Sequence, residues 1–187
     1  MYIWARLARM AALAKSRGPA KLGDKTRHGF RCWPTDIDNY MHMNNSRYST
    51  IADVGRIELF QRSGMWDLGK TRNWWPMMGG GQTAFIKEIK LWHRFELVSS
   101  METWEDRQIL GLHRFLLEDG SVAAIVRTSI GVFDYTNRRY VPIDEVAQAI
   151  GTRSKPREPD EGEREFLRSN AALRAMARSA KPGLTRT

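Results

Sequence analysis

The first eighteen positions carry apolar residues at helical spacing, with basic residues between them. Gly18 and Pro19 stop this pattern, so it predicts a basic amphipathic helix over residues 1–17. Such a helix lies on an anionic membrane surface or docks on its own domain or a partner subunit, and the pattern leaves these alternatives open. The apolar positions are Ile3, Leu7, Met10, Ala11 and Ala14.

The longest helical pattern runs from Asn45 to about Ser63, roughly 28 Å of helix and enough to cross several strands. Gly64 follows as a natural C-terminal stop. One stripe of this helix is apolar: Tyr48, Ile51, Ala52, Gly55 and Leu59. The other faces carry two acid–base pairs at ion-pair spacing, which indicates surface positions: Asp53 with Arg56, and Glu58 with Arg62.

After this helix the apolar pattern changes to that of strands. Glu118-Asp119-Gly120 is the clearest hairpin turn, and "HGFRCWP" before the helix supplies a further strand. The predicted class is therefore α+β, with an antiparallel sheet wrapped around one long central helix. Four segments alternate or run apolar at strand lengths: 83–92, 94–104, 108–118 and 121–135.

The remainder of the chain is more polar than its centre. A short helix is predicted at 141–151, followed by a charged stretch with two prolines that is typical of a linker. A weak amphipathic helix follows at about 163–179. The predicted organisation has three parts: a basic helix and linker (1–27), one folded domain (28–151), and a charged linker with a weakly helical tail (152–187).

The formal net charge of +9 lies in the two ends of the chain. Residues 1–32 hold eight Lys or Arg against one Asp, and residues 153–187 hold nine against five acidic residues. Residues 33–150 hold thirteen basic and fifteen acidic residues, which argues against a nucleic-acid-binding domain. The single cysteine, Cys32, excludes an internal disulfide and is expected to be a small buried side chain in a reducing compartment. We expect no transmembrane helix, since no apolar run is long enough.

The stretch "WPTDIDNYMHMNNSRY", residues 33–48, gathers polar side chains directly before the long helix. Backbone amides at a helix N-terminus are unpaired and partly positive, so they can polarise a carbonyl and stabilise an oxyanion. A carboxylate such as Asp38, on the other side of that carbonyl, can attack it or activate water. These parts suit hydrolysis of an activated acyl compound. They do not suit phosphoryl transfer, which needs a glycine-rich phosphate loop with its lysine.

The same residues also have structural interpretations. Asn44 or Asn45 can cap the helix, and Asp36 can brace the turn after Pro34. His42 can pack with one ring nitrogen bonded to the backbone. A metal site is not predicted, since none of the four histidines is paired at ligand spacing.

The pattern Asp36-x-Asp38-x-x-x-His42-x-Asn44-Asn45-x-x-Tyr48, leading into a long helix and antiparallel strands, resembles the hotdog-fold thioesterases. Within that superfamily it resembles the 4-hydroxybenzoyl-CoA thioesterase-like branch. The continuation "DVGRIELFQRSGMW", and then "GGGQTAFIKEIKLWHRFEL", is similar to the subgroup related to thioesterase superfamily member 6. The resemblance covers roughly residues 28–150.

The resemblance implies that Asp38 is the catalytic carboxylate and that His42 shapes the loop. It further implies that Asn44, Asn45 and Tyr48 frame the thioester carbonyl at the start of the helix. All five positions are therefore candidate site residues.

This chain departs from the family pattern after the catalytic aspartate. The family normally has a small residue or proline there and often a glycine before the histidine, whereas this chain has Asn39, Tyr40 and Met41. The change affects the width of the loop and hence the acyl group accepted. A second hotdog lineage uses a carboxylate on the central helix, for which Asp53 or Glu58 are the alternative candidates.

The resemblance also implies a homodimer or a dimer of dimers with sites between subunits. One helix on one sheet leaves strand edges exposed, which agrees with this expectation. Gly80 is predicted to let the backbone approach a substrate or partner closely, with a flexible turn as the alternative. Lys87 is predicted to contact coenzyme A phosphates, alongside Lys90 and Arg94, although each equally suits a solvated strand face.

Together these observations predict a cytoplasmic acyl-CoA thioesterase that uses no metal or other cofactor, with peripheral membrane contact through residues 1–17 as a further expectation. A hotdog hydratase is the nearest enzymatic rival. Its motif separates Asp from His by four residues and continues through Asn-Pro, whereas three residues separate Asp38 from His42 and no proline follows. A non-catalytic acyl-binding or membrane scaffold protein is the third alternative.

Overall fold

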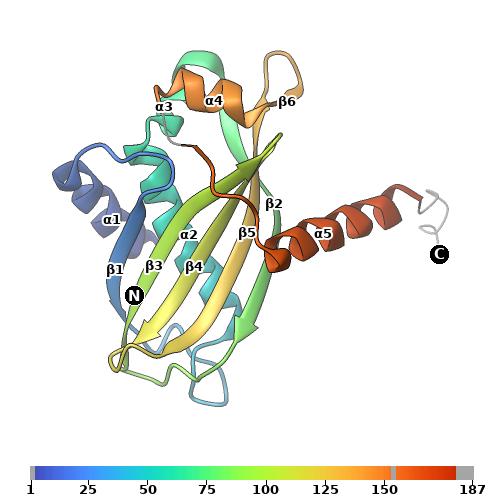
Figure 1. Cartoon of the computed structure of the whole chain (residues 1–187). Helices are drawn as coiled ribbons and strands as arrows, with labels where there is room; N and C mark the ends of the chain where they lie inside the picture. Colours follow the sequence, from blue (N-terminus) through green and yellow to red (C-terminus); the bar gives the residue numbers. More distant parts are fainter. Residues whose placement is uncertain (1–2, 153–154, 180–187) are drawn as a thin grey trace, which may run out of the picture.

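The fold is an antiparallel sheet curled around one long helix (Figure 1), and this computed structural model describes residues 3–152 and 155–179. The sheet order is β1-β3-β4-β5-β2, and β6 pairs with β5. The strands are β1 (Lys25–Arg31), β2 (Trp74–Phe85), β3 (Arg94–Glu105), β4 (Gln108–Leu117), β5 (Val122–Asp134) and β6 (Arg139–Val141). The helices are α1 (Ile3–Arg17), α2 (Asn45–Arg62), α3 (Met65–Arg72), α4 (Ile143–Ala149) and α5 (Glu161–Ser179). The predicted α+β arrangement is confirmed.

The central helix α2 buries its predicted apolar stripe against the sheet. Gly55 allows the helix to approach β3 closely, because a Cβ there would lie 2.1 Å from the Ser99 Oγ. Gly64 follows the helix in the left-handed conformation, with φ of 82°, as the predicted stop requires.

The first strand after α2 does not have the predicted bounds. A strand over 83–92 is wrong, because β2 covers 74–85 and residues 86–93 form a loop to β3. The strand continues through Pro76 because β2 lies at the edge of the sheet, where the missing backbone donor of proline is tolerated. The sequence pattern also did not predict the short elements α3 and β6.

Helix α1 docks on the domain itself, beside α2 and along the outer edge of β1 (Figure 1). Its Met10 and Ala14 side chains are buried there. Three of its arginines donate hydrogen bonds to carbonyls of alternate β1 residues, which point away from the sheet. The pairs are Arg6 to Arg31 (3.2 Å), Arg9 to Gly29 (3.2 Å) and Arg17 to Arg27 (2.9 Å). Of the alternatives left open for this helix, docking on its own domain is the one observed. The docked helix covers the outer edge of β1, which would otherwise be open.

Glu58 is an interior residue, which corrects its predicted surface position. Its side chain has no solvent exposure and pairs with Arg62, as expected, but also with His28 of β1 and Arg17 of α1. Burial alone would raise the pKa of Glu58, but hydrogen bonds from His28 and Arg17 hold it below its ordinary value. The prediction failed because two of the partners come from elements distant in sequence.

The glycine run of β2 lies against α5, which starts beside the sheet and extends away from it (Figure 1). Arg174 donates a hydrogen bond to the Gly79 carbonyl (2.6 Å), and a Cβ on Gly80 would lie 2.5 Å from the Asn170 side-chain nitrogen. The flexible-turn alternative for this run is wrong, since the glycines are part of a strand.

Among the described residues, no helix is long and apolar enough to cross a membrane.

Candidate active site

The polar loop between β1 and α2 is held against the loop between β2 and β3. Backbone pairing between His42 and Lys90 joins the two loops. Within the first loop the Asp38 amide donates to the His42 carbonyl (3.1 Å), and Met41 at the turn has a φ of 63°. The chain reversal therefore brings Asp38 and His42 together, as the spacing of the motif suggests.

Asp38 presents a partly exposed carboxylate at this turn, with 19% of its side chain accessible. Its Oδ1 accepts the Tyr40 amide (3.0 Å) and lies 3.8 Å from the His42 Nδ1. The His42 ring stacks on Tyr40, with 5.9 Å between ring centroids. Among the described residues no hydrogen bond is recorded to the Asp38 Oδ2, so this oxygen can face a substrate or water.

Asp36 has the bracing role that was its structural interpretation. It is buried, and the Arg6 guanidinium donates to both of its carboxylate oxygens, at 2.9 Å for the Nη1–Oδ1 pair. The Trp33 amide donates to its Oδ2 (3.0 Å), and its own carbonyl accepts the Asn44 amide (2.8 Å). The Asp36 carboxylate thus ties α1 to the start of the polar loop, and the Asp36 backbone carbonyl holds the start of α2.

The start of α2 is capped by Asn44, which confirms the capping interpretation for this residue. Its Oδ1 accepts the amide (2.9 Å) and the hydroxyl (2.7 Å) of Ser46. Asn45, the first helical residue, is exposed. Its backbone N–H lies in the first turn, where an amide has no intrahelical acceptor. The partly positive end of the helix is therefore directed at the region of the polar loop.

Tyr48 is buried below the loop and packs in the core instead of at the surface. Its ring meets Phe85 and Phe115 edge to face, at 5.1 and 5.0 Å between centroids. Burial raises the pKa of Tyr48 to about 12, with a smaller contribution from Cys32. The side chain supports the site from beneath and keeps its hydroxyl protonated.

The other two predicted positions lie in different places. Lys87 is exposed in the loop that pairs with the polar loop, and its amide donates to the Ala123 carbonyl (2.9 Å). Gly80 belongs to the part of β2 under α5, so the structure does not bring it together with the Asp38 turn. In the paired loop it is Lys90, through its backbone, that contacts His42.

The two alternative carboxylates on α2 have unequal access to solvent. Glu58 is fully buried, and its carboxylate is already paired with Arg17, His28 and Arg62. A substrate therefore has no access to it. Asp53 is 40% exposed and forms the predicted ion pair with Arg56. Burial raises the pKa of Asp53, and Arg56 opposes this effect. Asp53 is therefore the better structural rival to Asp38.

Arg6 is a site-supporting residue that the sequence pattern did not reveal. It lies one helical turn before Met10, on the same buried face of α1 as Met10 and Ala14. An arginine on such a face needs a buried acidic partner, and this was the sequence feature that could have revealed its role. Its partner Asp36 could not be identified because the two are thirty positions apart.

Cys32 and the histidines are the side chains from which a metal site would most readily be built. No group of three or more His, Cys, Asp or Glu side chains within the described ranges could hold a metal ion. Cys32 is buried, as predicted, and burial followed by the nearby Asp36 charge raises the pKa of its thiol to about 11.

Comparison with known proteins identifies the class and then the family. Among solved structures, a probable thioesterase from Escherichia coli, YbaW, superposes with a TM-score of 0.63 at 15% identity, over 69% of this chain and 98% of that one. The Staphylococcus aureus protein SAV2348, solved in complex with CoA, superposes with a TM-score of 0.59 at 15% identity, over 76% of this chain and 94% of that one. The fold is the hotdog fold of thioesterases. The family model described as the Thioesterase-like superfamily matches residues 32–150, and the chain belongs to this family.

Two curated relatives extend the comparison. Protein THEM6 from Xenopus laevis is 33% identical over 94 residues, which is 50% of this chain and 45% of the relative. Protein THEM6 from Drosophila melanogaster is 26% identical over 107 residues, 56% of this chain and 55% of the relative. The chain thus spans about half the length of the curated relatives it matches. The predicted resemblance is confirmed, and the family supports thioester hydrolysis as the general chemistry.

Proposed function

We propose that this protein hydrolyses an acyl-CoA thioester to a free acid and CoA, with Asp38 as nucleophile or general base. The observation that carries this proposal is the geometry of the polar loop. Asp38 is oriented by the Tyr40 amide, is partly exposed, and stands in the loop that leads into the N-terminus of α2. The CoA complex of the similar Staphylococcus aureus protein supports the choice of thiol.

Two routes use the same residues. In the first, the Asp38 carboxylate attacks the thioester carbonyl, the C–S bond breaks, CoA leaves as the thiolate, and water hydrolyses the resulting anhydride. In the second, Asp38 takes a proton from water as the water attacks the carbonyl. In both, the Asn45 amide and the positive end of α2 stabilise the oxyanion. His42 and Tyr40 hold the carboxylate in place.

The supporting roles of the remaining candidate residues follow from their positions. Asn44 keeps the helix start in place and Tyr48 forms the wall beneath the loop. Lys87 stands at the solvent-exposed rim, where a lysine can meet a phosphate of CoA as a point charge. Gly80 has no such role in this proposal, because the close packing of α5 explains why a glycine stands at this position.

A hydrolysis screen tests the proposal. The purified chain is incubated with short, long and aromatic acyl-CoAs, and the release of free thiol is followed. We expect turnover of at least one class that disappears when the protein is heat-inactivated. Binding of acyl-CoA without any thiol release across the three classes would contradict the proposal and favour the non-catalytic acyl-binding alternative.

A further inference from the structure

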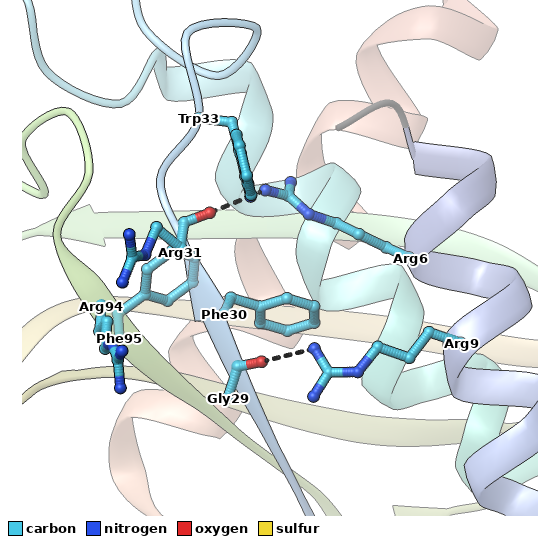
Figure 2. A pocket seen from close by; sticks show the side chains of 8 residues that line it. All are labelled: Arg6, Arg9, Gly29, Phe30, Arg31, Trp33, Arg94 and Phe95. Atoms are coloured by element: carbon cyan, nitrogen blue, oxygen red, sulfur yellow. Dashed lines mark hydrogen bonds between the residues drawn. The ribbon is translucent and has the colours of Figure 1, made fainter.

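A cavity of about 580 Å³ at the outer edge of β1 carries an unusual concentration of positive charge. It lies between α1 and the β1–β3 pair, and Figure 2 shows Arg6 and Arg9 approaching Phe30 from α1. Four of its eight lining residues are arginines, and no acidic residue lines it. The lining residues are Arg6, Arg9, Gly29, Phe30, Arg31, Trp33, Arg94 and Phe95.

Among the residues that the structure describes, one of the four arginines has an acidic partner. Arg6 forms the buried ion pair with Asp36 described above. Arg9 is exposed and bonds to the Gly29 carbonyl, which carries no charge. Within the described residues, the side chains of Arg31 and Arg94 have neither an ion pair nor a hydrogen bond. Three guanidinium charges at this cavity are therefore uncompensated.

The register of the sheet places two of these exposed charges directly opposite each other. Arg31 and Arg94 are direct cross-strand partners in the β1–β3 pair, and like charges placed opposite each other destabilise a sheet. The carboxylate that follows on the same face, Glu96, is already paired with Arg27 at 2.6 Å. A bound anion would remove the repulsion and use the fork-like donors of both guanidinium groups.

The aromatic lining narrows the class of ligand. Trp33 is half-buried at this cavity and packs edge-on against Trp92 with 5.3 Å between centroids, whereas Phe30 lies on the core-facing side of β1, opposite to Arg31. Such rings offer flat apolar surface beside the charges. We propose that this cavity binds a phosphate ester with a flat or apolar group, with the phosphate between Arg31 and Arg94 and the apolar group against Trp33. This proposal assigns Arg94, which the sequence placed near coenzyme A phosphates or in solvent, to a cavity that Lys87 and Lys90 do not line. It does not depend on thioester hydrolysis.

The test uses the full chain and three probes. AMP represents a soluble phosphate ester, inorganic phosphate represents the charged group alone, and vesicles of phosphatidylcholine with or without phosphatidic acid represent a lipid headgroup. Binding is measured by calorimetry or vesicle sedimentation, together with the melting temperature, which a ligand of the folded state raises. Binding should weaken as salt is added.

The informative variant is Arg31→Gln with Arg94→Gln. It should bind the probe about tenfold more weakly or worse, as expected when charge-assisted bonds to phosphate are lost. Without ligand it should melt no lower than the wild type, because the repulsion between the two arginines is gone. The control, Arg164→Gln with Arg178→Gln on α5, removes the same charge on the other side of the sheet and should bind normally (Figure 1).

The probes also separate the two sources of phosphate. Binding of AMP identifies a soluble ester, and binding of phosphatidic acid vesicles alone identifies a lipid headgroup, provided the paired variant loses it. The proposal is overturned if no probe binds, if the paired variant binds as well as the wild type, or if the unliganded variant melts lower than the wild type.

Discussion

Asp36 and Asp38 stand two positions apart and have opposite environments. Asp36 is buried and paired with Arg6, whereas Asp38 is accessible and held by a single backbone amide and a nearby histidine. Removing the partner of a buried, fully bonded carboxylate is costly, whereas an accessible carboxylate is free to react. The sequence suggested a turn brace at Asp36 and the catalytic carboxylate at Asp38, but it did not reveal the arginine from the N-terminal helix that pairs with Asp36.

We expect Asp36→Asn to lower stability far more than turnover. It leaves the Arg6 charge buried without its partner, which costs about 3 kcal/mol in comparable cases. Urea denaturation measures this loss, and hydrolysis per folded molecule is measured alongside. A variant as stable as the wild type would show that Asp36 does not brace the loop.

His113 of β4 makes the stability of the fold depend on pH. It is completely buried, with Nδ1 2.8 Å from the Ser99 Oγ and Nε2 3.3 Å from the Thr128 Oγ1. Burial, and then the charge of Arg56, lowers the pKa of His113 from 6.5 to about 3. The folded protein therefore keeps this ring neutral at pH values where the unfolded chain binds a proton.

Stability should consequently fall as the pH drops below 6.5 and should continue to fall towards pH 3. The slope contributed by this one group is about 1.4 kcal/mol per pH unit. Urea denaturation between neutral and mildly acidic pH measures it. His113→Gln keeps a neutral hydrogen-bonding side chain that does not titrate, so its slope should be flatter; an unchanged slope would contradict the assignment.

At the scale of elements, α1 belongs to the folded domain more closely than its composition suggests. Its arginines bond to three outward carbonyls of β1, and Arg17 also reaches buried Glu58. The pattern predicted the helix, because periodicity is local. It could not predict the docking, because the acceptors are backbone groups and a carboxylate on distant segments.

Deletion of residues 1–17 should therefore lower the melting temperature and expose the β1 edge. Unpaired edge carbonyls promote association with other chains, so light scattering should also detect aggregates. Ala12→Ser, at an exposed position of α1, provides a control that should change neither property. An unaltered melting temperature after the deletion would mean that α1 is dispensable for the fold.

The same reasoning explains which other elements could be predicted. The long helix and the β3, β4 and β5 segments were recognisable from local spacing and from one clear turn. The bounds of β2 were missed because its glycines suggested a break, whereas pairing with β5 and packing under α5 keep them in a strand.

For the whole molecule, the two edges of the sheet differ. The β1 edge is covered by α1, whereas β2 is the opposite edge strand and exposes Met77, Met78 and Phe85. An open, apolar edge strand favours pairing with a second copy. We expect a homodimer or a dimer of dimers joined through β2.

Light scattering at micromolar concentration should give at least twice the chain mass. Met78→Glu with Phe85→Glu should shift the population towards the monomer, because buried unpaired carboxylates oppose association. The paired change Leu173→Glu with Met176→Glu, on the exposed part of α5, adds the same charge as a control. A well-folded wild-type monomer would contradict this assembly.

The most direct test of the central claim is the turnover of acyl-CoA by Asp38→Asn. This substitution keeps the shape of the side chain and removes its charge and basicity, so the chemical step should fall by about 10²-fold or more. Acyl-CoA binding should persist, and Asp53→Asn should remain active. Near-wild-type turnover by Asp38→Asn, with loss of activity in Asp53→Asn, would place the catalytic carboxylate on α2 and contradict the account.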